Sequence, residues 1–200
     1  MCKSLTSIHL PEGITSIGNM AFDECKSLTS IHLPKGINSI GYSVFYGCES
    51  LTSIHLPEGI TSIGNSAFDR CYSLTSIELP NSLKSLGGNP FLSCTNLNII
   101  SHSNRFRIIN GLLIDFESST VISCLSNNNE IIVPDGIRHI GDWAFFMGKS
   151  LTFIHLPEGI ISIGDWAFCG CKSLTSIELP ASVTSIGEEA FPEECEVIRK

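Results

Sequence analysis

Histidine is the residue whose repeated spacing in this chain could support chemistry. One series of His and Glu residues recurs at steps of 23 residues, with one interruption: His9, His32, His55, Glu78, His155 and Glu178. Imidazole and carboxylate are zinc ligands, but zinc requires them in a tetrahedral arrangement about 2 Å from the metal. Side chains in a parallel row reach that geometry only by rotamer adjustment, and duplicated copies keep a residue whether or not it is used. We therefore expect no metal ion and no cofactor.

Cysteine is the second reactive residue type, with nine copies. Five of them share one 23-residue register: Cys2, Cys25, Cys48, Cys71 and Cys94. Their apolar surroundings predict a buried stack of free thiols, because neighbouring Cβ vectors would run parallel and disfavour a disulfide. Three further cysteines lie outside this register and are expected to be the more exposed thiols: Cys124, Cys169 and Cys195.

Catalysis has no support in the sequence. The chain lacks a nucleophile elbow, a phosphate-binding glycine loop and a metalloprotease helix motif. A net charge of -8 argues against nucleic acid as a partner, because the acidic chain and the nucleic-acid phosphates would repel each other. No apolar run approaches the roughly 18 residues of a spanning helix, so membrane insertion is not expected. We predict no catalytic residues and no enzymatic activity.

A 23-residue repeat positions all these side chains, and residues 48–70 show it most cleanly. In the first copy, Leu5, Ile8 and Leu10 alternate with polar residues, which predicts a half-buried strand. A turn follows, then a second short apolar edge, and then Ala21 and Phe22 in what we interpret as one helical turn. The sequence therefore predicts an α/β repeat solenoid with short parallel strands and mostly single-turn helical segments.

The repeat spans residues 1–200 and predicts one solenoid domain of about eight coils. Regular coils are expected at 2–93 and 125–193, and a polar cap at 194–200. The intervening repeat, 94–124, is longer and contains Asn-Gly between two apolar runs, which predicts a projecting hairpin. Because no cap precedes Cys2, end-to-end self-association through the first coil is a further expectation.

Residues 51–71 resemble the BspA-type leucine-rich repeat, and the segment from Asn110 to Gly136 resembles the longer, hairpin-bearing repeat of that family. The resemblance implies a surface or secreted protein used in adhesion to host matrix proteins or to other cells. This chain shows no signal peptide, because Met1–Ser4 lacks an apolar core, so a cytoplasmic location is the alternative.

In leucine-rich repeats the sheet is the concave face, and here its outward residues form columns of Thr and of His or Glu. Eight rungs about 4.8 Å apart give a face near 40 Å long, which suits a protein rather than a small molecule. Phe153 is the expected anchor, because aromatic residues dominate binding hot spots. The predicted partner-binding residues are Thr6, His9, Thr29, His32, Thr52, His55, Thr75, Glu78, Thr152, Phe153, His155, Thr175 and Glu178.

These features predict a protein-binding module that resembles an adhesin, or a fragment of one. An intracellular leucine-rich-repeat scaffold is the alternative. Trp143 and Trp166 occupy matching places in adjacent coils, either as a stacked exposed pair or, as we favour, in core or edge packing.

Overall fold

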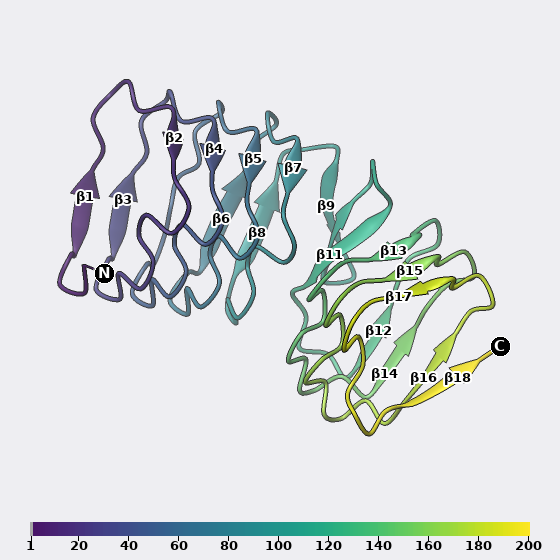
Figure 1. The fold of residues 1–200 in the computed structure, drawn as a ribbon. Coiled ribbons are helices and arrows are strands. Elements are labelled where there is room, and N and C mark those ends of the chain that lie inside the picture. Colours follow the sequence, from purple (N-terminus) through teal and green to yellow (C-terminus); the bar gives the residue numbers. More distant parts are fainter. Residues whose placement is uncertain (1) are drawn as a thin grey trace. The chain divides into compact units, whose positions relative to one another are not determined.

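The computed structural model describes residues 2–200, in which the chain is built from short strands and turns (Figure 1). Its contacts are concentrated in two compact units, the first ending at Asn104 and the second beginning at Arg105. Residue 1, where the predicted single domain starts, lies outside the described residues. The two units are called unit 1 and unit 2 below.

Unit 1 stacks coils whose strands all pair in parallel. The longer strands form two pairs, β1 (Ser7–His9) with β3 (Ser30–His32) and β6 (Ser76–Leu79) with β8 (Asn98–Ser101). Between these pairs the third coil contributes one bridge, from Ser53 to Ser76. The shorter strands form one four-stranded sheet: β2 (Ser16–Ile17), β4 (Ser39–Ile40), β5 (Ser62–Ile63) and β7 (Ser85–Leu86).

Unit 2 begins with an antiparallel hairpin and continues as parallel coils. The six strands of its main sheet are, in spatial order, β17 (Ser185–Ile186), β15 (Ser162–Ile163), β13 (His139–Ile140), β11 (Thr120–Cys124), β10 (Leu112–Asp115) and β9 (Phe106–Ile109). Two parallel pairs lie alongside: β12 (Glu130–Ile132) with β14 (Phe153–His155), and β16 (Ser176–Leu179) with β18 (Glu196–Arg199). The predicted cap, 194–200, thus contributes a strand that pairs with the preceding coil.

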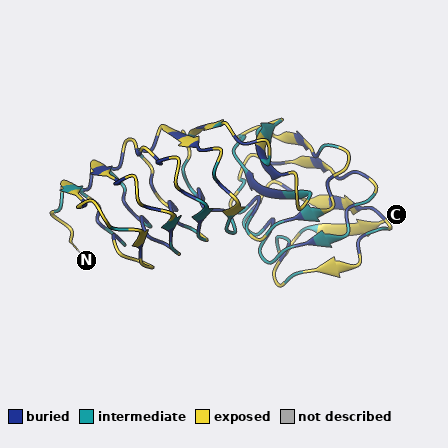
Figure 2. Cartoon of the chain, turned by 90° about the horizontal axis from the view of Figure 1, so that it is seen from above, coloured by how far each residue is buried: buried dark blue, intermediate teal, exposed yellow. Residues whose placement is uncertain are grey.

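The core of each unit lies inside its coils, and buried and exposed residues alternate along parallel strands such as β6 and β16 (Figure 2). Aromatic rings stack along the axis: in unit 1 the Phe45 and Phe68 rings lie 5.2 Å apart. In unit 2 Phe168 lies between Phe145, at 4.8 Å, and Phe191, at 5.8 Å. A row of phenylalanine rings therefore forms the centre of each core, and each ring is covered by the equivalent ring of the next coil.

The prediction of single-turn helical segments is wrong, since residues 2–200 contain no helix. In the segment expected to be helical, every second backbone N–H bonds to the neighbouring coil, as Phe22 N does to Val44 O at 2.9 Å. The intervening N–H groups close four-residue β-turns, as in the bond from Asp23 N to Met20 O at 3.1 Å. Met20 and Glu24 have φ values of 58° and 49°, which a right-handed helix excludes. The fold is a β-solenoid of about eight turns.

Asn or Asp side chains join neighbouring coils after the short strands. Asn65 Oδ1 accepts a hydrogen bond from Gly88 N at 3.0 Å in unit 1, and Asp165 Oδ1 accepts one from Glu188 N at 2.8 Å in unit 2. The glycine beside this bond is required for close approach, because a Cβ on Gly87 would lie 2.2 Å from Asn65 Oδ1. The side-chain hydrogen bond and the close approach of glycine therefore occur together, and the bond recurs in several coils of both units.

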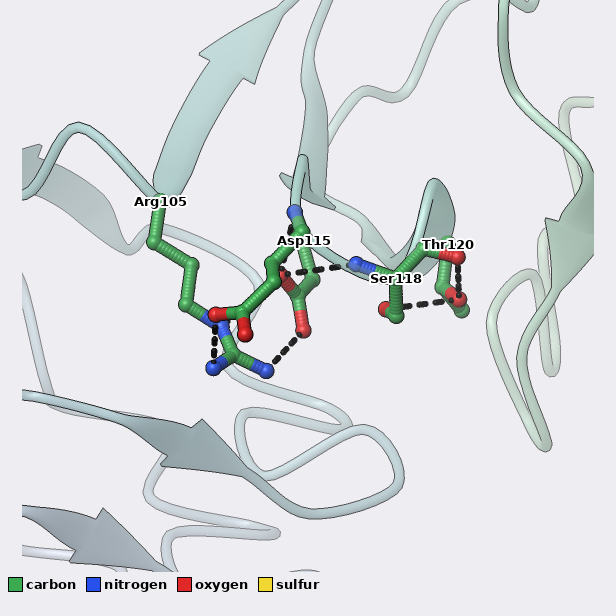
Figure 3. Close-up of polar contacts among 5 residues, drawn as sticks. Arg105, Asp115, Ser118 and Thr120 are labelled. Carbon is green, nitrogen blue, oxygen red and sulfur yellow. Dashed lines mark hydrogen bonds and ion pairs between the residues drawn. The ribbon is translucent and has the colours of Figure 1, made fainter.

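The predicted hairpin is present, with Asn110 and Gly111 at φ 53° and 75° between β9 and β10, as a two-residue hairpin turn requires. An ion pair fastens the hairpin (Figure 3). Arg105 Nε and Nη2 donate to the two Asp115 carboxylate oxygens at 2.9 and 2.7 Å, and Arg105 Nη1 also bonds Glu117. Burial would raise the pKa of Asp115, but hydrogen bonds from Arg105, Ser118 and the Glu117 backbone outweigh it and lower that pKa.

Truncation of Phe168 to alanine should destabilise the protein by about 3–5 kcal/mol, because the cavity between two fixed rings cannot collapse. Phe153→Ala is the matched control in the same unit, since Phe153 is 50% exposed and Phe168 is fully buried. The control should change the free energy of unfolding by about 0.5 kcal/mol. Urea unfolding measures both, and equal losses would mean that the inward and outward faces are reversed.

Asp115→Asn should destabilise the protein by about 1–3 kcal/mol at pH 7, because it leaves Arg105 without its buried carboxylate. The folded-state pKa of Asp115 is lowered, so its stabilisation is present above the unfolded pKa near 3.8 and is lost as pH falls through the lower folded value. Unfolding curves of wild type and variant should therefore converge at acidic pH. Asp135→Asn, at an exposed position, is the control and should show no such pH-dependent difference. A stability difference that stays constant down to pH 2 would contradict the ion-pair explanation.

Candidate binding surface

The cysteine row is part of the core rather than a reactive site. Cys25, Cys48, Cys71 and Cys171 are buried free thiols. Cys48 Sγ donates to Phe22 O at 3.2 Å, and Cys171 Sγ makes the equivalent bond to Phe145 O at 3.0 Å. Burial raises the pKa of the Cys48 and Cys171 thiols to about 12, so neither forms the reactive thiolate near neutral pH.

Two cysteines depart from the predicted burial pattern. Cys2 shares the buried register but is exposed, and Cys94, at the last position of the register, is only partly buried. The first coil has no described coil before it to cover its thiol. Cys124, Cys169 and Cys195 are partly buried and thus intermediate in exposure, between Cys2 and the buried row.

The predicted binding residues of unit 1 lie on one exposed face, which we call the outward strand face of unit 1. It carries the exposed side chains of Thr6, His9, Thr29, His32, Thr52, His55, Thr75 and Glu78. The His9 and His32 rings stack in parallel, with centroids 4.9 Å apart and planes 4° apart. This stacking follows from the parallel pairing of β1 and β3, in which His9 is opposite His32.

Threonine has a structural task on this face. Thr29 Oγ1 donates to Thr6 O in the preceding coil at 3.0 Å, and Thr152 Oγ1 donates to Asn129 O in unit 2 at 3.0 Å. Two further hydroxyls make the same bond at 3.4 Å: Thr52 and Thr75. Because these donors are already used within the fold, the His, Glu and apolar residues of the face are the groups available to a partner.

A shallow hollow of about 210 Å³ marks the outward strand face of unit 1, with His55 and Glu78 among its lining residues. It lies where the third coil pairs through a single bridge, so the sheet is least regular there. Glu78 also lies 3.7 Å from His102 Nε2, an electrostatic contact that sequence spacing does not predict. The hollow is open and is bordered by polar groups, which suits a side chain of a partner better than an enclosed ligand.

The outward strand face of unit 2 carries an apolar pair instead. It includes five predicted residues, all exposed: Thr152, Phe153, His155, Thr175 and Glu178. Phe153 is 50% exposed, and Ile132, which sequence reasoning missed, is 61% exposed. In the pairing of β12 with β14, Ile132 is opposite His155 and Glu130 is opposite Phe153. Strand alternation places these four side chains on one face, with Ile132 and Phe153 as diagonal neighbours.

The sequence signal that could have identified Ile132 is its position, 23 residues before His155. Its coil retains only the tail of the motif, so the column of His and Glu residues was not extended through it. Lys200 Nζ bonds Glu178 Oε2 at 2.7 Å, so the far side of the same face is partly neutralised.

The described part of the chain holds neither a cluster of metal-ligating side chains nor a long apolar helix. Residues 2–200 hold no group of three or more His, Cys, Asp or Glu side chains able to bind a metal ion. The same residues include no helix of the length and apolar character needed to cross a bilayer.

Parallel coils, a buried repeat motif and an exposed strand face define a leucine-rich-repeat solenoid. The family described as BspA type Leucine rich repeat region matches residues 1–120 and 115–199, with six copies. The chain belongs to this family, as its sequence motif predicted. A search of curated proteins found no significant match.

Solved structures of bacterial proteins share the fold. A leucine-rich repeat protein from Eubacterium ventriosum is 26% identical, with a TM-score of 0.73 over 92% of this chain. The pneumococcal vaccine antigen PcpA is 22% identical, with a TM-score of 0.67 over 93%. A leucine rich cell surface protein from Faecalibacterium prausnitzii is 24% identical, with a TM-score of 0.56 over 96% of this chain and 72% of its own. This chain spans 56% and 59% of the first two proteins.

Alkylation of the native protein at pH 8 should label Cys2 first and leave Cys48, Cys71 and Cys171 unreacted until the protein is unfolded in urea. Exposure makes the Cys2 thiol accessible, whereas burial both blocks the other three and raises their pKa values. Peptide mass spectrometry after timed labelling measures each site. Native labelling of Cys48 or Cys71 as fast as Cys2 would show that the coil register is wrong.

Proposed function

We propose that this chain is a non-enzymatic protein-binding module that uses its outward strand faces, as an adhesin-like part of a cell-surface protein. The observation that carries the proposal is the exposed apolar pair of Ile132 and Phe153, which Glu130 and His155 border on the outward strand face of unit 2. Exposed apolar groups with a polar surround are typical of the centre and rim of protein interfaces.

The repeat fold supports this function because it presents a long, regular surface. Repeat solenoids bind macromolecular partners through extended faces of stacked strands. In unit 2 Phe153 supplies the aromatic anchor, while His155 and Glu130 supply polar groups beside it. Extracellular matrix or host surface proteins are the proposed partner class, as family membership and the cell-surface protein from Faecalibacterium prausnitzii both support.

The second candidate is an intracellular scaffold that uses the same face on another protein. Its interaction chemistry is identical, so the two candidates differ only in location. Antibody binding to intact rather than permeabilised cells distinguishes them. Self-association through the first coil remains a secondary proposal, and analytical ultracentrifugation tests it.

Replacing both Ile132 and Phe153 by serine should weaken binding of a protein partner at least about tenfold, because the change removes an apolar hot spot. The melting temperature should change little, since both side chains are exposed. Biolayer interferometry against individually purified matrix and host surface proteins measures the affinity of wild type and variant.

Ile186→Ser is the matched control, because Ile186 is an exposed apolar residue in β17, outside the outward strand face of unit 2. This control should bind as wild type does. A partner whose affinity is unaffected by the double variant and reduced by the control would place binding elsewhere and exclude the proposed face.

A further inference from the structure

A second exposed surface lies on the turns of unit 2, in a different part of each coil from the outward strand face. We call it the tryptophan edge, and it consists of Asp142, Trp143, Asp165, Trp166, Glu188 and Glu189. The two indole rings are 4.7 Å apart and tilted by 41°, and both side chains are partly exposed. The Phe146 ring packs against the Trp143 ring, with the two centroids 5.0 Å apart. The pair thus forms a supported aromatic surface that solvent reaches.

The fold does not require tryptophan at these positions, as the repeats of unit 1 show. Ser43 and Ser66 occupy the equivalent places there, with φ values of 51° and 52°, against 62° and 51° for Trp143 and Trp166. The backbone is thus the same with a small polar residue as with an indole. A left-handed conformation favours small residues over bulky ones. Packing of the coil therefore does not explain the aromatic pair.

The acidic residues also exceed what the coil requires. Asp142 Oδ1 accepts a hydrogen bond from Asp165 N at 3.0 Å, a task that the neutral Asn19 performs in unit 1 with Tyr42 N at 2.9 Å. An amide oxygen is thus sufficient for the structural bond. The carboxylate adds a negative charge, and the equivalent position in the next coil, Asp165, adds another. Stacked coils place such charges about 5 Å apart, where they repel each other by roughly 0.8 kcal/mol in water.

This charge has no ion-pair partner among residues 2–200. None of the four acidic residues of the tryptophan edge takes part in an ion pair, and Glu189 Oε2 accepts a hydrogen bond from Trp166 Nε1 at 3.0 Å. The indole rings are therefore bordered by negatively charged carboxylates. Aromatic faces bordered by uncompensated carboxylates match a cationic group, which both features attract.

We propose that the tryptophan edge binds an arginine-containing segment of a protein partner. A guanidinium group stacks on an indole face and at the same time donates two parallel hydrogen bonds to a carboxylate, which an ammonium group cannot do. A neutral ligand would leave the repulsion among the carboxylates in place. This surface is separate from the one in the proposed function, and it differs from that surface in the chemistry of its partner.

Tryptophan fluorescence tests the proposal directly, because the chain's two tryptophans both lie in this edge. The probe is a short acetylated, amidated peptide of alternating arginine and glycine. Its addition should change the emission saturably, and the affinity should fall as salt is raised. The same peptide with glutamine in place of arginine should cause no saturable change.

The decisive variant is Asp142→Asn combined with Asp165→Asn, which installs the residue that unit 1 uses and keeps both fluorophores. It should retain the melting temperature and weaken peptide binding about fivefold or more, the factor expected from about 1 kcal/mol of lost attraction. Glu158→Gln combined with Glu196→Gln removes two exposed charges of unit 2 that lie outside the tryptophan edge, and it should leave binding unchanged. Trp166→Ser should also weaken binding, with Trp143 as reporter.

Four results would overturn the proposal. Unchanged affinity in the double asparagine variant would exclude the carboxylates. Equal losses of peptide affinity in the asparagine and glutamine double variants would show that binding is only general charge attraction. An unchanged affinity with Trp166→Ser would show the same. Saturable quenching by the glutamine peptide or by a neutral oligosaccharide, equal to that by the arginine peptide, would assign the edge to another ligand class.

Discussion

The structure depends on hydrogen bonds between the backbones of successive coils, repeated at every turn of the chain. Phe45 N donates to Ala67 O at 2.8 Å, and Phe145 N makes the same bond to Ala167 O at 2.8 Å in unit 2. These bonds hold each coil at one strand spacing from the next, so side chains at equivalent positions of successive coils stack on one another. Stacked phenylalanine rings, buried thiols and close-packed glycines are three consequences of that single constraint. A core position therefore tolerates little variation, whereas an outward position is free to change.

The 23-residue period predicted the coils and their buried rows, and Asn-Gly between two apolar runs predicted the hairpin, because each rests on local alternation or on turn chemistry. The helical turn was the error, and its cause is physical. Apolar spacing around Ala21 and Phe22 fits one turn of helix, but the N–H of Phe22 bonds to the next coil instead of back along the chain. Non-glycine residues such as Met20 and Arg70 then take φ values of 58° and 60°. Nothing in their side chains indicates this conformation, which the stacking of coils imposes.

The candidate surface was predictable only in part, for a similar reason. Strand alternation identified which residues point outward, and their exposure agrees with it. It did not reveal that the Thr29 hydroxyl donates a hydrogen bond to Thr6 O, or that His102 lies close to Glu78. Both contacts depend on distances between coils. Ile132 was missed because its coil lacks the head of the motif. Repetition predicts a row well, and it predicts poorly where one member of the row differs from the others.

Those differences carry the most information about function, because the other copies of the repeat act as internal controls. A residue that recurs with the same contact is explained by the coil, as Asn19 and Asn65 are by the hydrogen bonds that they accept from the next coil. A residue that departs from its row, while the backbone stays the same, needs another explanation. Phe153 replaces a serine of the same column, and Trp143 stands where unit 1 has Ser43. Both changes put aromatic surface into solvent, which costs free energy unless a partner covers it. For that reason we propose that binding uses unit 2 residues that the fold itself does not require.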